Sequence, residues 1–254
     1  MKQRLDLELV SRQLSSTRSQ AQLTIRLGLV FVNRQKAISP SQTVDQNSII
    51  TINQPLKYVS RGGLKLEHAL KEFNIKPKNY TCLDIGASTG GFTDCLLQNG
   101  AKKVYALDVG THQLADKLKL NPRVISLEQT NFRHWNKLPE TINLVVIDVS
   151  FISITSILNH LKKIFSEYTA QNILEIGNRK LEIVCLLKPQ FEAGPKNLRK
   201  GVVKNPKIHE LVKKNFRQFC QENNFSIINE TTSPLLGPKG NKEFLFYLKL
   251  NQNL

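Results

Sequence analysis

The stretch Asp84-Ile85-Gly86-Ala87-Ser88-Thr89-Gly90-Gly91-Phe92 decides the fold. An apolar strand leads into it, a glycine-rich turn follows, and apolar residues then recur at helical spacing from Phe92 to Leu97. Glycines allow a backbone to approach a ligand closely, and the start of a helix offers unpaired N–H groups. The stretch therefore predicts a strand–turn–helix unit with a ligand at its turn.

Further apolar runs on both sides of this stretch predict more strands. Together with the first strand they cover residues 83–86, 104–108, 144–148 and 183–188. Continuous apolar strands that alternate with helical patterns are typical of a parallel sheet covered on both faces. Ligands of such sheets bind at the carboxyl ends of the strands, where polar residues follow each run. Alternation at residues 225–228 and 243–248 predicts a final antiparallel pair.

Acidic residues around the glycine turn indicate the cofactor. The dinucleotide pattern Gly-x-Gly-x-x-Gly is absent because position 88 is serine. Asp84 would repel a pyrophosphate but suits the cationic amino-acid end of S-adenosylmethionine. Asp108 ends the next strand, where Rossmann-like domains hold ribose hydroxyls. We therefore expect S-adenosylmethionine rather than NAD, and the alternative is a tight turn without a ligand. The expected cofactor-binding residues are Asp84, Gly86, Ser88, Thr89, Gly90, Gly91, Phe92, Asp108 and Val109.

Four charged residues outside the turn are candidates for catalysis: Lys65, Asp148, Lys188 and Glu243. Asp148 and Lys188 each end an apolar strand, where burial without a partner would be costly. A lysine beside a carboxylate can serve stability alone. Two lysines and two acids at the carboxyl edge of a cofactor-binding sheet are, however, typical of a reaction site.

Residues 1–56 predict a small separate unit. Apolar residues at 5–14 and 21–27 predict two short helices, with Ser16 or Thr17 as the N-cap of the second. Gly28 ends that helix, and residues 29–32 and 48–52 predict two strands. The unit carries more basic than acidic residues, which suggests an acidic partner.

The composition of the whole chain points to nucleic acid. Its 254 residues include 36 Lys and Arg against 20 Asp and Glu, a net charge of +16. Such a surface attracts phosphate backbones, although a merely solvated basic surface is the alternative. Hydrophobic residues make up 40% of the chain, which is enough for a packed core and excludes wholesale disorder.

Several classes of protein are not expected. No apolar run approaches the roughly 18 residues of a membrane-spanning helix, and no secretory signal is visible. We therefore expect a cytoplasmic protein. The cysteines, Cys82, Cys95, Cys185 and Cys220, form no Cys-x-x-Cys pair, and the five histidines show no ligand spacing. We expect neither a metal nor a structural disulfide.

The first unit resembles the S4 RNA-binding domain. The resemblance rests on Arg4-Leu5-Asp6, Leu9 and the stretch 17–33. In that family a glycine usually follows the position of Asn33, whereas this chain has Arg34, which replaces the residue that favours a tight turn but adds a cation. The resemblance implies contacts with structured RNA. The expected contacts in this unit are Arg4, Arg18, Arg26 and Arg34.

The rest of the chain resembles the haemolysin A (TlyA) family of ribosomal RNA 2′-O-methyltransferases, within the FtsJ-like group. The motifs that carry this resemblance are residues 58–66, 84–92, 106–110, 147–153, 187–192 and 240–244. It implies an α/β fold, in which an S4-like α+β domain (1–56) and a linker (57–64) precede a Rossmann-like class I methyltransferase domain (65–254). The sheet of that domain is expected to be mostly parallel and seven-stranded.

The resemblance also implies an activity. It is methyl transfer from S-adenosylmethionine to the 2′-hydroxyl of a cytidine in ribosomal RNA. The family's catalytic tetrad falls on Lys65, Asp148, Lys188 and Glu243. Lys188 would take or steer the hydroxyl proton, with its charge tuned by the two acids, and Lys65 would hold the substrate.

Further contacts follow from the resemblance. Asn131 stands where the family reads the adenine, and a loop cap is the alternative. Phe151 would stack on a flipped cytosine unless it belongs to the core. Arg61 is expected to touch RNA, as is Lys200, which belongs to a basic run between residues 196 and 217. Such runs are usually solvated faces, but this one follows Lys188 directly.

Three other functions are alternatives to methylation of a ribose hydroxyl. The family name raises a membrane-lytic protein, and an RNA-binding assembly factor without enzymatic activity would share the fold. A base-nitrogen methyltransferase would show Asn-Pro-Pro-Tyr or Asp-Pro-Pro-Tyr where this chain has residues 148–151. Family members that also modify 16S rRNA carry extended termini, so we expect 23S rRNA as the substrate. We expect a monomer that acts on ribosomal subunits.

Overall fold

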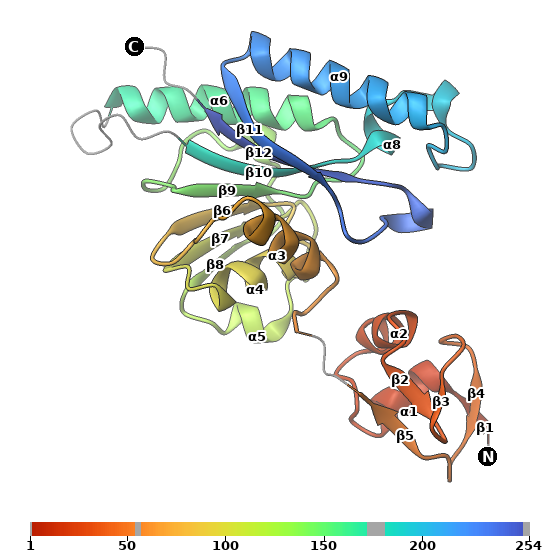
Figure 1. Ribbon diagram of the computed structural model, residues 1–254. Helices are drawn as coiled ribbons and strands as arrows, with labels where there is room; N and C mark the ends of the chain where they lie inside the picture. Colours follow the sequence, from red (N-terminus) through yellow and green to blue (C-terminus); the bar gives the residue numbers. More distant parts are fainter. Residues whose placement is uncertain (1, 54–56, 172–180, 251–254) are drawn as a thin grey trace. The chain divides into compact units, whose positions relative to one another are not determined.

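The computed structural model describes residues 2–53, 57–171 and 181–250. They form two compact units that divide between Arg61 and Gly62 (Figure 1). The first unit contains β1 (Lys2–Arg4), α1 (Leu5–Ser11), α2 (Arg18–Arg26), β2 (Val30–Val32), β3 (Gln35–Lys36), β4 (Thr43–Asp45) and β5 (Ile50–Ile52). This is the α+β unit that the sequence predicts, with β1 and β4 as an additional antiparallel pair.

The helices of the first unit pack on a small apolar core. Leu5 and Leu9 from α1 meet Ala21 and Ile25 from α2. The Thr17 hydroxyl accepts a hydrogen bond from the Gln20 N–H at 3.2 Å, which confirms Thr17 as the N-cap. The first helix is shorter than predicted, because α1 ends at Ser11.

The tight turn between β2 and β3 forms although glycine is missing. Val32 pairs with Gln35, so only Asn33 and Arg34 connect the two strands. Both residues have positive φ, 48° and 67°, as a two-residue type I′ turn requires. Arg34 therefore sits in a conformation that costs a non-glycine residue about 1 kcal/mol.

The second unit is a sheet with helices on both faces. Its elements are α3 (Gly62–Glu72), β6 (Thr81–Ile85), α4 (Gly91–Gln98), β7 (Lys103–Leu107), α5 (Asp116–Lys119), β8 (Val124–Leu127), η1 (Phe132–His134), β9 (Leu144–Ile147), α6 (Ile154–Gln171), β10 (Leu181–Leu187), α8 (Pro189–Glu192), η2 (Pro195–Asn197), α9 (Pro206–Glu222), β11 (Phe225–Thr232), η3 (Pro238–Gly240) and β12 (Phe244–Leu250). Because α3 starts at Gly62, the last three residues of the predicted linker (57–64) are helical.

The strand order of this sheet is β11-β12-β10-β9-β6-β7-β8. Neighbouring strands from β10 to β8 are parallel, whereas β12 is antiparallel to both β10 and β11. This confirms the predicted mostly parallel seven-stranded sheet and its final antiparallel pair. Strand β8 lies outside the predicted strands; it is short and half exposed, so it lacks a continuous apolar run.

The core explains why the strands are apolar throughout. Helices α6 and α9 lie on one face of the sheet, and α3 and α4 lie on the other (Figure 1). Leu83, Val145 and Ile183 pack in one cluster with residues of α6 and α9. Within the described residues no helix is long and apolar enough to span a membrane. All four cysteines are buried free thiols.

Candidate active site

A cleft of about 410 Å³ opens at the carboxyl edge of the sheet. It lies where β6, β7 and β9 end, because parallel strands bring their carboxyl ends to one edge. Predicted site residues that border it are Gly86, Ser88, Asp108, Val109, Asn131, Asp148 and Phe151. The fold thus brings together residues that are up to 65 positions apart in the chain.

The glycine turn forms one wall of the cleft. Gly86 has φ 85°, and a Cβ there would lie 2.6 Å from the backbone oxygen of Asp148. Ser88 takes φ 48°, the left-handed conformation that glycine favours, at the position where dinucleotide-binding proteins have glycine. Its N–H donates to Asp108 Oδ2 at 2.8 Å, and the Gly110 N–H donates to Oδ1 at 2.8 Å. Both contacts hold the Asp108 carboxylate in place at the cleft.

Asp84 lies below the turn and does not border the cleft. It is fully buried, and its Oδ2 accepts a hydrogen bond from the Thr93 hydroxyl at 2.6 Å. Among the described residues no partner reaches its Oδ1. Burial raises the pKa of Asp84 to about 7, against the lowering effect of Thr93. A positive charge close to this carboxyl group would therefore favour its ionised form.

The remaining residues of the glycine motif have other places. Gly90 is the N-cap of α4 with φ 90°, and Thr89 beside it is exposed. Gly91 and Phe92 are buried in the first turn of α4, and neither borders the cleft. Their contribution to a ligand site is thus to set the direction of the helix.

Asn131 is a loop cap that also borders the cleft. Its Oδ1 accepts a hydrogen bond from the Arg133 N–H at 3.1 Å. The residue lines the cleft together with Val109. The cap therefore fixes the loop that carries Asn131 at the cleft.

Lys188 and Asp148 form the first of two ion pairs at this edge. Lys188 follows β10, Asp148 follows β9, and Lys188 Nζ lies 2.6 Å from Asp148 Oδ1. Lys188 is 7% exposed, and its ammonium also donates to Ser150 Oγ at 2.9 Å. The contact with Asp148 is an ion pair without hydrogen-bond geometry, whereas the contact with Ser150 is a hydrogen bond that orients the ammonium group.

Lys65 and Glu243 form the second pair. Lys65 belongs to the first half of α3, and its Nζ lies 2.6 Å from Oε2 of Glu243, just before β12. Glu243 is 1% exposed, and its other oxygen accepts a hydrogen bond from Gln190 Nε2 at 3.1 Å. Gly237 packs against this carboxylate, since a Cβ there would lie 2.0 Å from Oε1. Glu243 is thereby enclosed by groups that fix its orientation.

Three of these residues were missed by the sequence reasoning: Ser150, Gln190 and Gly237. Ser150 and Gln190 each stand two positions after a tetrad residue, inside recognised motifs, so their closeness in sequence to the tetrad could have indicated them. The sequence contains no such signal for Gly237, because its role depends on its contact with Glu243, which forms only in the folded chain.

Phe151 is not part of the core. It is 91% exposed and has φ 64°, a conformation that is strained for a bulky residue. Its ring lies 5.2 Å from the ring of Phe191, centroid to centroid. An exposed aromatic side chain in a strained conformation at the rim of a cleft is a candidate ligand contact.

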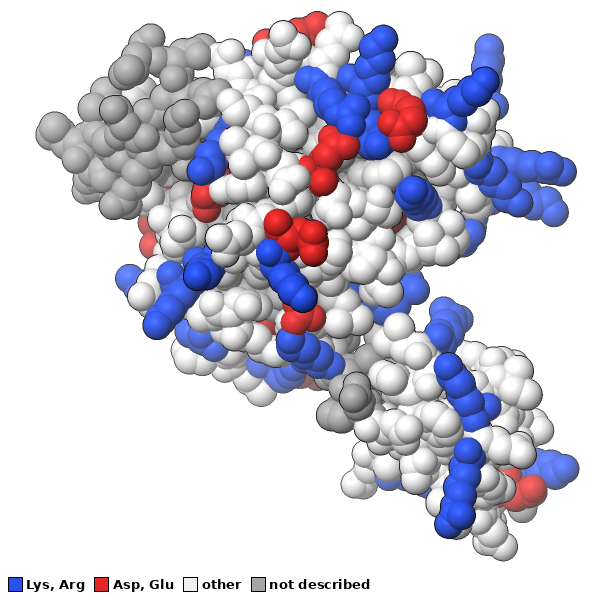
Figure 2. Space-filling view, in the orientation of Figure 1, with Lys and Arg blue, Asp and Glu red and all other residues white. Residues whose placement is uncertain are grey.

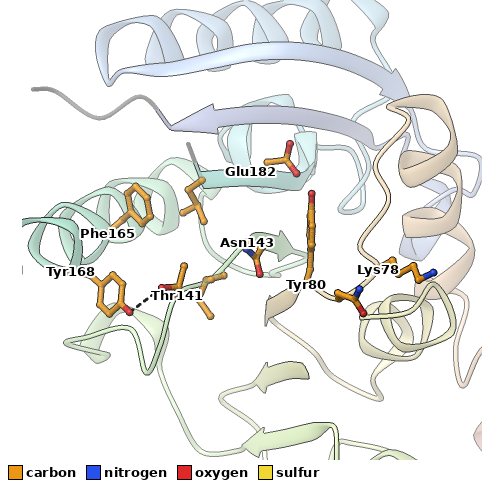
Figure 3. Close-up of a pocket in the computed structure, with 10 residues that line it drawn as sticks. Lys78, Tyr80, Thr141, Asn143, Phe165, Tyr168 and Glu182 are labelled. Atoms are coloured by element: carbon orange, nitrogen blue, oxygen red, sulfur yellow. Dashed lines mark hydrogen bonds between the residues drawn. The ribbon is translucent and has the colours of Figure 1, made fainter. Parts of the chain in front are cut away.

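A second cavity, of about 450 Å³, lies at the amino ends of the strands (Figure 3). Tyr80, Asn143 and Glu182 point into it, and Tyr168 contacts Thr141 at 3.3 Å. None of the predicted site residues borders this cavity. The cleft at the carboxyl edge is therefore the candidate active site. Among the described residues, no group of three metal-ligating side chains gathers at either place.

The predicted RNA contacts of the first unit differ in their surroundings. Arg4 and Arg18 both bind the buried carboxylate of Asp6, each at 3.0 Å, and these contacts hold its pKa well below the usual range. Both arginines thus also stabilise the fold, although each remains partly exposed. Arg26 and Arg34 are exposed, and Arg61, at the end of the unit, is half-buried.

In the second unit a basic surface lies near α9. Figure 2 shows Lys and Arg side chains projecting around this helix and the loop before it. Lys213 and Arg217 contact Glu230 of β11, so they contribute little net charge. The exposed basic residues that remain are Lys196, Arg199, Lys200, Lys204, Lys207 and Lys214. Lys200 stands at the tip of a two-residue turn between Arg199 and Val202.

Comparison with known proteins gives two family matches. Residues 58–250 match the FtsJ-like methyltransferase family, and residues 3–50 match the S4 domain. The chain is 45% identical to Hemolysin A of Brachyspira hyodysenteriae, over 95% of this chain and 98% of that protein. It is 38% identical to the 16S/23S rRNA (cytidine-2′-O)-methyltransferase TlyA of Mycobacterium tuberculosis, over 97% and 89%. A solved structure from Streptococcus thermophilus, described as a hemolysin, has a TM-score of 0.75 at 41% identity, over 99% of this chain and 90% of that one.

Proposed function

This chain belongs to the FtsJ-like methyltransferase family, and we propose that it methylates the ribose 2′-hydroxyl of a cytidine in ribosomal RNA, with S-adenosylmethionine as the methyl donor. The observation that carries the proposal is the pair of ion pairs, Lys188–Asp148 and Lys65–Glu243, at the carboxyl edge of the sheet. The S4 domain supports RNA as the substrate.

The residues of the cleft fit S-adenosylmethionine. Asp108 is held by two N–H donors and keeps lone pairs for the two hydroxyls of a ribose. Gly86 leaves space where a Cβ would fill the turn. Asp84 Oδ1, which has no partner among the described residues, would attract the ammonium group of the cofactor from below the turn. Val109 and Asn131, which line the cleft, would contact the adenine. Bound S-adenosylmethionine supplies an electrophilic methyl group on a positively charged sulfur.

The chain's own residues position the acceptor hydroxyl. The Lys188 ammonium has three N–H bonds, one of which donates to Ser150, while Asp148 forms an ion pair with the same group. Another N–H can bind the acceptor oxygen and stabilise the negative charge that develops as its proton passes to water in the cleft. Lys65, fixed by Glu243, adds a second positive charge that can hold the ribose or its phosphate. Most of the rate enhancement is then alignment of the two reactants.

The RNA itself has two kinds of contact in this proposal. Phe151 offers an exposed ring on which a flipped cytosine can stack. The exposed basic residues before and along α9, with Lys200 at the tip of its turn, offer cations for phosphates. Arg4, Arg18, Arg26 and Arg34 in residues 1–56, and Arg61 in the linker, are further candidate contacts with RNA phosphates. The catalytic domain is taken as residues 65–254.

The test is incorporation of label from S-adenosylmethionine into separated ribosomal subunits, free rRNA and assembly intermediates. Wild type should label a cytidine 2′-hydroxyl in one or both subunits, mapped by resistance to alkaline cleavage. Lys188→Ala should lose the activity, and Lys163→Ala, an exposed lysine on α6, should keep it. Binding of cofactor and RNA without transfer to any of these RNAs would refute the proposal in favour of an assembly factor. The same preparations, run through size exclusion and cell fractionation, test our further proposal of a cytoplasmic monomer.

A further inference from the structure

The ammonium of Lys188 contacts two side chains of a single turn, Asp148 by an ion pair and Ser150 by a hydrogen bond. After β9 ends at Ile147, Asp148 and Ser150 approach Lys188 Nζ to 2.6 and 2.9 Å. Lys188 is 7% exposed and does not border the cleft, whereas Ser150 is exposed and does. Ser150 is therefore the neutral polar side chain that joins the buried ammonium group to the cleft.

We propose that Ser150 is a positioning residue for Lys188 in methyl transfer. The four bonds of an ammonium nitrogen are tetrahedral, so rotation about the Cε–Nζ bond decides where the three N–H bonds point. The contact with Asp148 Oδ1 has the distance of an ion pair but not the geometry of a hydrogen bond. The hydrogen bond to Ser150 Oγ therefore fixes this rotation, and with it the directions of the other two N–H bonds, one of which the acceptor hydroxyl has to meet. This inference rests on the proposed methyl transfer.

Other neighbours of Lys188 cannot take over this role. The ring of Phe191 lies 5.8 Å from Nζ, and a ring face stabilises a cation without fixing the direction of an N–H bond. Asp148 supplies charge. The distance between its Oδ1 and Lys188 Nζ stays the same when the ammonium group rotates about the Cε–Nζ bond, so this contact does not fix the directions of the N–H bonds. The hydroxyl of Ser150 also keeps its own hydrogen, which can be donated into the cleft while its oxygen accepts from Lys188.

The chain offers a matched control in the same loop. The Ser153 hydroxyl donates to Glu192 Oε2 at 2.7 Å and lies 2.8 Å from the Thr155 hydroxyl. It supports the start of α6, and no contact with the tetrad is present among the described residues. Ser153→Ala therefore removes a hydroxyl of the same size without touching Lys188.

The first experiment compares kcat and KM of wild type, Ser150→Ala, Ser150→Thr and Ser153→Ala. Loss of one charge-assisted hydrogen bond should lower kcat of Ser150→Ala about 10-fold, with KM for S-adenosylmethionine little changed. Ser150→Thr keeps a hydroxyl and should restore kcat, and Ser153→Ala should leave kcat and KM unchanged.

A second measurement does not depend on methyl transfer. Acetic anhydride in trace amounts acetylates lysine amines, and mass spectrometry then quantifies the Lys188 peptide after a fixed time at one pH. Labelling of Lys188 should be faster in Ser150→Ala, where the amine has lost its hydrogen bond to Ser150, than in wild type or in Ser153→Ala. If wild type methylates no RNA, the proposed function fails, while this labelling still tests the contact.

Three results would overturn the inference. The first is an unchanged kcat in Ser150→Ala, whatever the labelling shows. The second is an equal loss in Ser153→Ala, which would make the effect a general weakening of the loop. The third is unchanged labelling of Lys188, which would show that Ser150 does not hold the ammonium in solution.

Discussion

Replacing Lys65 by methionine tests whether the Lys65–Glu243 pair serves methyl transfer or the stability of the fold. The substitution keeps the apolar stem of the side chain and removes the charge. Glu243 then remains as a carboxylate whose side chain is fully buried, with Gln190 as its remaining donor among the described residues. Removing one partner of a buried ion pair lowers the free energy of unfolding by about 3–5 kcal/mol. Because Gln190 still donates a hydrogen bond to Glu243, we expect a loss of about 3 kcal/mol.

The double variant Lys65→Met/Glu243→Leu removes both charges at once. Because the two side chains are only 10% and 0% exposed, apolar replacements should pack in their place, and most of the lost stability should return. Neither variant should methylate RNA. Recovery of stability without activity would show that the pair is kept for the reaction.

Urea unfolding followed by tryptophan fluorescence measures these effects. The single tryptophan, Trp135, belongs to the second unit, so it reports the unit that contains the pair. With a slope of about 2 kcal/mol per molar urea, the loss expected in Lys65→Met lowers the midpoint by about 1.5 M. Lys163→Met, on the exposed face of α6, serves as control and should stay near wild type. An unchanged midpoint in Lys65→Met would refute the reasoning.

Three other predictions follow from single positions. Arg34→Gly relieves a left-handed arginine, so it should stabilise the first unit by about 1 kcal/mol in thermal unfolding. The same change removes an exposed cation and should weaken RNA binding, with a salt dependence reduced by about one unit of slope. Gly237→Ala places a methyl group against the Glu243 carboxylate and should lower kcat roughly 100-fold, with S-adenosylmethionine affinity by calorimetry unchanged. Because burial raises the pKa of Asp84 to about 7, the folded chain holds a proton there that the unfolded chain releases above about pH 4. The stability of the second unit should therefore fall between pH 4 and pH 7, by up to about 4 kcal/mol, and Asp84→Asn should remove this part of the fall.

Each of these predictions has a clear contrary result. A less stable Arg34→Gly variant would mean that the arginine makes contacts which outweigh its conformation. A Gly237→Ala variant with normal kcat would show that Glu243 moves without consequence. For Asp84, the same pH dependence in wild type and Asp84→Asn would assign the effect to other groups, and Thr93→Val, which removes the donor to Asp84, gives a further check.

Much of the site could be predicted from the sequence because its residues stand at the ends of strands. Asp84, Asp108, Asp148 and Lys188 each follow or close an apolar run, and parallel strands place such residues at one edge. The alternative that Phe151 belongs to the core is wrong, because its side chain is 91% exposed in the turn after β9. Strand β8 and the pair β1–β4 escaped prediction, since short, half-exposed strands carry little periodicity.

The sequence by itself determined the fold class, the order of the two units and the chemistry of the edge, because hydrophobic periodicity and the glycine turn are local signals. Only the tertiary structure decided how the charges pair. Lys65 meets Glu243 across 178 positions of the chain, and Ser150 meets Lys188 across 38. Likewise, Glu230 of β11 neutralises part of the basic run on α9. Such contacts depend on the direction of individual side chains, which is set by packing between elements that are distant in the sequence.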